Sequence, residues 1–146
     1  MRLGIPAALR RSGSALPMKE TAVPEAEIEA AVRNLIRAGS TYDLDALDPC
    51  YAPDLEIVMV APDGQAMVFD RAANMAFFRD RRDGGAPPLS QDVRFIHTAA
   101  TGDIGCAVVE RRMALTGPEV QTIVFTLMLR RDAAGWTVFR ETAVGR

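Results

Sequence analysis

Charged side chains inside strand-like runs of the last third of the chain are the candidates for chemistry. Arg111 and Glu141 fall in two such runs and alternate onto one predicted sheet face. In an apolar pocket, a carboxylate could move a proton and a guanidinium could hold a carboxylate or an enolate. Because a buried charge is costly unless it is paired, an internal Arg111–Glu141 ion pair with a purely structural role is the alternative.

Four runs rich in Val, Ile, Phe and Thr hold these residues, at 90–101, 104–115, 119–131 and 136–144. Gly, Pro and Asp residues between the runs predict hairpin turns and antiparallel strands. From residue 122 to 129 every side chain is apolar or threonine, so both faces of that strand must be covered. Helices can cover one face, and we expect a second subunit on the other. A monomer with an exposed apolar patch is the alternative.

The turns also predict a register, which divides the strands into two faces. On the face of Arg111 and Glu141, the register places Thr126 opposite Glu141 and close to Val109. The other face is expected to meet the partner subunit. Its polar groups, which would line the pocket if the assignment were inverted, are His97, Glu110 and Arg140.

The histidine and cysteine content narrows the kinds of site. The chain has one histidine, His97, and two cysteines, Cys50 and Cys106, which lack a CxxC spacing. A zinc site or a Ser-His-Asp triad is therefore disfavoured, and we expect no metal and no cofactor. His97 is expected to pack at an interface or in the core, with catalysis as the alternative. Both thiols are expected to be reduced, as in a cytoplasmic protein.

The net charge and the length of the chain limit the remaining classes of protein. A formal net charge of −2 over 146 residues argues against a nucleic-acid or membrane surface, which needs a basic face. No run approaches the roughly 18 apolar residues of a membrane span. We expect one domain, residues 23–146, in the cytoplasm. Residues 1–22, with three arginines and a broken apolar pattern in the first 17, are expected to be a disordered tail.

The first half of the chain predicts helices and a hairpin. Apolar residues at helical spacing begin after Pro24 and stop at Gly39, and a short helix starts near Asp43. The remaining elements are two strands and a third helix, at 54–61, 65–69 and 71–82. The predicted order is α-α-β-β-α-β-β-β-β, an α+β fold.

This order and two phrases resemble the nuclear transport factor 2-like superfamily, and most of all its SnoaL-like bacterial members. The phrases run from Ala38 to Leu55 and from Arg130 to Val138. The resemblance implies a cystatin-like cone, in which a strongly curved, mixed and mostly antiparallel sheet wraps three helices, and a homodimer packed sheet to sheet. Related members include isomerases, cyclases and dehydratases, along with proteins that bind without catalysing, so the fold alone does not choose a function.

Compared residue by residue, the resemblance disfavours ketosteroid isomerase chemistry. The positions of that enzyme's proton-shuttling aspartate and oxyanion tyrosine fall at Met59 and Leu35, which lack both groups. In the kinase II association domain a strand arginine projects into the pocket, and its equivalent here is Arg111. This match makes the Arg111 face the concave one. The implied ligand-binding residues are Tyr42, Tyr51, Met59, Val109, Thr126, Met128 and Phe139, and packing is the alternative role for the two tyrosines.

Three functions remain open. The first is a binder of a small, largely apolar molecule. The second is a cofactor-independent isomerase, cyclase or dehydratase acting on a small carbonyl compound, with Glu141 as base and Arg111 as electrostatic stabiliser. The third is a dimeric assembly module without a ligand. A hollow cone with both charged residues exposed inside favours the first two, and a cone filled by its own side chains favours the third.

Overall fold

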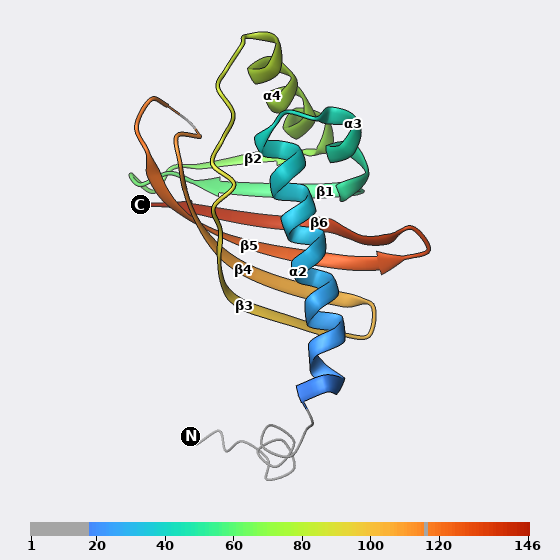
Figure 1. Ribbon diagram of the computed structural model, residues 1–146. Helices are drawn as coiled ribbons and strands as arrows, with labels where there is room; N and C mark the ends of the chain where they lie inside the picture. Colours follow the sequence, from blue (N-terminus) through green and yellow to red (C-terminus); the bar gives the residue numbers. More distant parts are fainter. Residues whose placement is uncertain (1–17, 116) are drawn as a thin grey trace.

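The computed structural model describes residues 18–115 and 117–146 (Figure 1). Within these ranges the helices are α2 (Met18–Ser40), α3 (Leu44–Leu47) and α4 (Arg71–Asp83), with a 3-10 turn, η1 (Asp48–Cys50). The strands are β1 (Tyr51–Val60), β2 (Ala66–Asp70), β3 (Arg94–Thr101), β4 (Ile104–Met113), β5 (Gln121–Asp132) and β6 (Gly135–Gly145). Most of the predicted tail lies outside the described residues. Helix α2 begins at Met18, ahead of the predicted start at Pro24.

The strands form one mixed sheet in the order β2-β1-β6-β5-β4-β3. Strands β1 and β6 are parallel, and the other neighbouring pairs are antiparallel. Figure 1 shows α2 crossing the curved sheet on one side, with α3 and α4 beside its β1–β2 end. The predicted α+β architecture, a curved and mostly antiparallel sheet wrapped on three helices, is confirmed. No helix among the described residues has the length and apolarity to span a membrane.

Helix α2 packs an apolar stripe against the sheet. Its residues Ile28, Val32, Leu35 and Ile36 recur at helical spacing, and all four are buried. Ile28 lies so close to Gly105 of β4 that a Cβ atom at Gly105 would overlap the Ile28 side chain. The helix can approach the sheet this closely because glycine has no side chain. We call the sheet face that meets the helices the inner face, and the opposite one the outer face.

The register of β5 differs by one residue from the predicted one. Val109 of β4 pairs with Phe125, and Glu141 of β6 pairs with Leu127. The side chains of β5 on the inner face are buried, and they are Ile123, Phe125, Leu127 and Leu129. The pattern of buried and half-buried residues alternates along the strand, as expected when only one face meets the helices.

Three predicted ligand-binding residues therefore lie on the outer face, and their assignment to the concave face was wrong. Thr126 and Met128 are the half-buried, outward-facing members of β5. In β6 the register with β5 shifts by one residue between Val138 and Arg140, and this β-bulge turns Phe139 outward. The hairpin turn predicts the register correctly only as far as the bulge.

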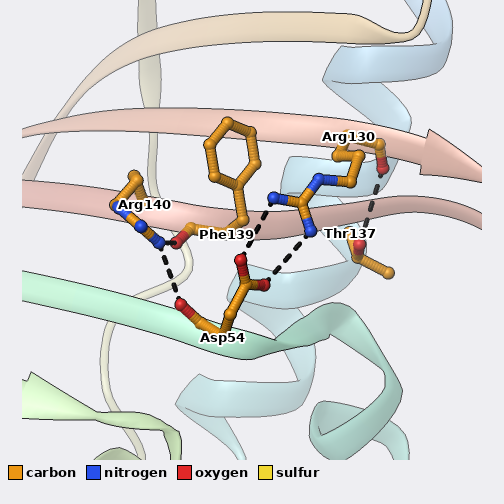
Figure 2. Close-up of polar contacts among 5 residues, drawn as sticks. All are labelled: Asp54, Arg130, Thr137, Phe139 and Arg140. Carbon is orange, nitrogen blue, oxygen red and sulfur yellow. Dashed lines mark hydrogen bonds and ion pairs between the residues drawn. The ribbon is translucent and has the colours of Figure 1, made fainter.

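The outward Phe139 belongs to a charged cluster on β1, β5 and β6 (Figure 2). Arg130 bonds both carboxylate oxygens of Asp54, at 3.1 and 3.2 Å. The guanidinium of Arg130 lies 4.5 Å from the centre of the Phe139 ring, and that of Arg140 lies 5.7 Å from it. Phe139 thus packs against two arginines on the outer face and not against a ligand inside the cone.

Candidate functional site

A cavity of about 100 Å³ lies between the inner face and the helices. Its lining is mostly apolar, and its polar members are Ser40, Tyr51, Asn74, Arg111 and Glu141. One water molecule needs roughly 10–15 Å³ of such a cavity. The cone is therefore hollow, with room for several waters or a small organic molecule.

The predicted site residues separate into those that line the cavity and those that do not. Tyr51, Met59, Val109, Arg111 and Glu141 line it. Tyr42 is buried but lies outside this lining, so the structure does not bring it to the cavity with the others. Its hydroxyl donates to the carbonyl oxygen of Pro87 at 2.8 Å and accepts from Nε of Arg81 at 3.0 Å. Tyr42 packs, which was the alternative for this residue.

The strands that carry Arg111 and Glu141 are separated by β5. Arg111 pairs with Ile123, whereas Glu141 pairs with Leu127, four residues further along β5. These positions are about 10 Å apart across the sheet and about 13 Å along it. The side chains feel each other's charge across the cavity, but in the described part of the chain no direct ion pair joins them. The internal ion pair, which was the alternative to a functional site, is therefore absent from the described residues.

Neutral acceptors hold Arg111. Its Nη2 donates to Oγ of Ser40 at 3.1 Å and to the carbonyl oxygen of Ser90 at 2.7 Å. Its Nε is buried and has no hydrogen-bond partner. Burial lowers the pKa of Arg111 to about 10, and the nearby carboxylate of Glu141 opposes this shift. The guanidinium therefore keeps its charge at neutral pH, and its buried Nε donor is unused.

Glu141 is a buried carboxyl without a partner. The residue is 9% exposed, and no group among residues 18–115 and 117–146 donates a hydrogen bond to it. Burial raises the pKa of Glu141 to about 7, although the charge of Arg111 pulls in the opposite direction. A carboxyl that titrates near pH 7 can both accept and release a proton under cellular conditions.

Asn74 of α4 is a cavity residue that the sequence analysis missed. It is 8% exposed, and its Nδ2 makes no hydrogen bond of normal geometry. The amide nevertheless lies close enough to the Tyr51 hydroxyl to act on the pKa of that group, which it lowers. Burial and the charge of Glu141 raise the pKa of Tyr51 above its ordinary value. The available signal was helical spacing, because Asn74 precedes two cavity-lining residues, Phe77 and Phe78, by three and four positions.

The alternative pocket, built from the polar residues of the opposite face, does not form. His97 is exposed on the edge strand β3, and Arg140 belongs to the outer cluster around Phe139. Glu110 binds Arg94 at 3.3 Å and Arg146 at 2.9 Å. Within the described ranges, no three His, Cys, Asp or Glu side chains are grouped to hold a metal ion.

Comparisons with known proteins agree with this architecture. The family model of the SnoaL-like domain matches residues 28–141. An NTF2-like protein of unknown function from Silicibacter pomeroyi DSS-3 superposes with a TM-score of 0.67 at 19% identity, over 90% of this chain and 100% of that one. A domain of unknown function with a cystatin-like fold from Nostoc punctiforme PCC 73102 gives 0.65 at 14% identity, over 86% and 79% of the two chains.

A third solved structure is described by an activity. The ketosteroid isomerase-like protein from Erwinia carotovora atroseptica SCRI1043 gives a TM-score of 0.59 at 20% identity, over 84% of this chain and 96% of that one. At such identities the likeness shows the fold alone. Leu35 and Met59, which stand at the isomerase's tyrosine and aspartate positions by sequence resemblance, both line the cavity. The comparison with curated proteins found no match.

Proposed function

The chain belongs to the SnoaL-like domain family, and we propose that its cavity binds a small, largely apolar molecule with at least one polar group. The observation that carries this proposal is the unpaired carboxyl of Glu141 inside an apolar cavity. Buried polar groups are normally hydrogen-bonded. A bound ligand that donates a hydrogen bond would explain why this carboxyl has no partner in the protein. Apolar walls around a few convergent polar groups are the usual composition of a small-molecule site.

Binding is tested by NMR titration of the protein with small ketones, amides and carboxylic acids. Val109→Phe places a larger side chain in the cavity, and Val108→Phe makes the same change at the neighbouring, half-buried position of the outer face. We expect at least one compound to shift the signals of cavity residues in the wild type and in Val108→Phe. The same compound should not shift them in Val109→Phe, provided that this variant keeps a folded spectrum. Binding that persists in folded Val109→Phe, or no binding at all, contradicts the proposal.

The pKa of Glu141 favours a second candidate function, proton transfer on a small carbonyl compound. Above about pH 7 the ionised carboxylate could take a proton from the carbon next to a carbonyl group, and Arg111 could stabilise the enolate oxygen. This design would be unlike that of ketosteroid isomerases, because Leu35 and Met59 supply no acid or base.

Deuterium exchange measures this proton transfer directly. The exchange of the protons next to the carbonyl of acetone is followed by NMR in D₂O, with and without the protein. A catalysed rate should rise with pH through about 7 and then level off, because the base must be ionised. Glu141→Gln should abolish the catalysed rate, and Glu110→Gln on the outer face should leave it unchanged. Equal rates in the wild type and Glu141→Gln would exclude Glu141 as the base.

We also propose that the chain forms a homodimer through the outer face. No helix of the described residues packs on that face, and Val108, Val124 and Met128 lie there half-buried. Light scattering tests the oligomeric state of Val124→Lys against Val23→Lys, a change on α2 at a residue that is 61% exposed. We expect Val124→Lys to be a monomer and Val23→Lys to remain a dimer. A monomeric wild type contradicts the proposal.

A further inference from the structure

The cavity contains two hydrogen-bond donors that the protein itself does not use. Nε of Arg111 and Nδ2 of Asn74 are both buried without a partner, one on β4 and the other on α4. Each buried donor that lacks an acceptor costs roughly 1–3 kcal/mol. A ligand with acceptor oxygens would satisfy both donors. We therefore expect the ligand to place hydrogen-bond acceptors at the polar end of the cavity.

The charge of Arg111 narrows the choice of acceptor. Its two hydrogen bonds go to Ser40 and to the backbone of Ser90, which are both neutral. The carboxyl of Glu141 makes no ion pair with it, and it is close to half protonated near pH 7. A desolvated guanidinium favours an anionic acceptor, and a planar carboxylate fits its geometry. One arginine in a mostly apolar cavity suits a single negative charge better than a dianion.

The size and lining of the cavity describe the rest of the ligand. A cavity of about 150 Å³ suffices for benzene, and the volume here is about 100 Å³. The side chains around it come from Leu, Ile, Val, Met and Phe residues. Because this cavity is smaller than the one that holds benzene, the remainder of the ligand should be a short or branched alkyl group.

We propose that the ligand is a small apolar monocarboxylate whose oxygens accept hydrogen bonds from Arg111 and Asn74. This inference rests on the proposed function and adds the chemical class of the ligand. It also has a consequence for Glu141, because a second carboxylate in the same cavity disfavours the ionised form of the first. The ligand should therefore bind together with one proton on Glu141.

The other titratable side chains that line the cavity should not contribute to proton uptake when the ligand binds near pH 7. The titratable side chains that line the cavity are Tyr51 from β1, Arg111 from β4 and Glu141 from β6. The helices contribute the neutral Ser40 and Asn74. Tyr51 and Arg111 change charge only well above pH 7, because burial raises the pKa of the first and leaves that of the second at about 10. Between about pH 6 and pH 8, proton uptake on binding reports Glu141.

The test compares acids with their neutral amides by isothermal titration calorimetry. The probes are isovalerate and isobutyrate, with isovaleramide and isobutyramide as matched neutral compounds. We expect the acids to bind at least about tenfold more tightly than the amides at or below pH 7, the usual size of a charge-assisted hydrogen bond. Above pH 7 the affinity for the acids should fall by about tenfold per pH unit, and the affinity for the amides should not.

Variants identify the donors. Asn74→Ala should weaken acid binding about tenfold, and Arg111→Met should weaken it more. The controls are Asn34→Ala, an exposed asparagine of α2 outside the cavity lining, and Arg112→Met, the exposed neighbour of Arg111. These two should leave binding unchanged. Asn74→Ala removes a smaller side chain than Arg111→Met does, and it leaves the hydrogen bonds of Arg111 with Ser40 and Ser90 in place, so it should fold even if Arg111→Met does not.

The outcomes separate this inference from the proposed function. Amides that bind as tightly as the acids, or acid binding without proton uptake above pH 7, would overturn the monocarboxylate assignment while leaving a small-molecule cavity in place. Acid binding that Asn74→Ala does not weaken would overturn the role of Asn74. Failure of all four probes together with every ketone of the NMR set would overturn both the inference and the proposed function.

Discussion

Glu141→Gln should stabilise the protein above neutral pH, although it removes a charged group. The carboxyl of Glu141 is buried without a hydrogen bond from the described residues, so its ionised form is disfavoured in the folded state. Its pKa is about 7 in the folded protein, against an ordinary value of 4.5. Glutamine has nearly the same shape and carries no charge at any pH.

The magnitude and the sign follow from this difference in pKa. Each pKa unit corresponds to about 1.4 kcal/mol, so the rise from 4.5 to about 7 means that ionisation of Glu141 costs the folded state about 3 kcal/mol. Because the pKa is raised on folding, the folded protein binds this proton more tightly than the unfolded chain does. The contribution of Glu141 to stability is therefore fully present below pH 4.5 and is lost as the pH rises through 7.

Urea unfolding followed by the fluorescence of Trp136, the one tryptophan of the chain, measures this effect. Above about pH 8 the free energy of unfolding of Glu141→Gln should exceed that of the wild type by up to about 3 kcal/mol, and below about pH 4.5 the two should nearly agree. Glu110→Gln is the control of opposite sign, because the hydrogen bond from Arg94 lowers the pKa of Glu110. A difference between wild type and Glu141→Gln that does not change with pH, or that grows as the pH falls, would refute the reasoning.

Two further predictions concern the scaffold. Gly105→Ala should lower the free energy of unfolding by about 1–3 kcal/mol, because its Cβ atom would overlap Ile28. Gly117→Ala, where no atom lies close, should change it by less than about 0.5 kcal/mol, and equal effects in urea unfolding would contradict this account. Asp70→Ala removes the acceptor for the backbone N–H of Ala73, 2.8 Å away at the start of α4, and should cost about 1 kcal/mol in the same assay. No loss of stability in Asp70→Ala would show that the cap is replaced by water.

Local patterns predicted the elements well, because each pattern depends on residues close in the chain. The spacing of Ile28, Val32 and Leu35 identified the packed face of α2, and Asp70 identified the start of α4. Glycine and aspartate between strands located the turns. The placement of Arg111 and Glu141 on the inner face also follows from alternation within their own strands, once the concave face has been chosen.

Register was harder to predict, because it depends on how two strands meet. The extra residue at Phe139 shifts the pairing of β5 with β6, and the residues of the turn do not indicate this shift. Thr126 and Met128 were assigned to the wrong face because of this bulge and because the pairing of β5 with β4 is also one residue away from the predicted one, although their strand was predicted correctly. A slip of one residue exchanges the two faces of a strand, so small errors of pairing change the whole list of cavity residues.

By itself, the sequence determined the order of helices and strands and the two charged candidates, because these depend on spacing and turn chemistry along the chain. Only the tertiary structure decided that Asn74 joins the cavity from α4 and that Arg111 and Glu141 stay apart across β5. It also decided that Glu141 titrates near neutral pH. Burial, and with it the cost of ionisation, sums over neighbours that are distant in sequence, and only the folded chain brings these neighbours together.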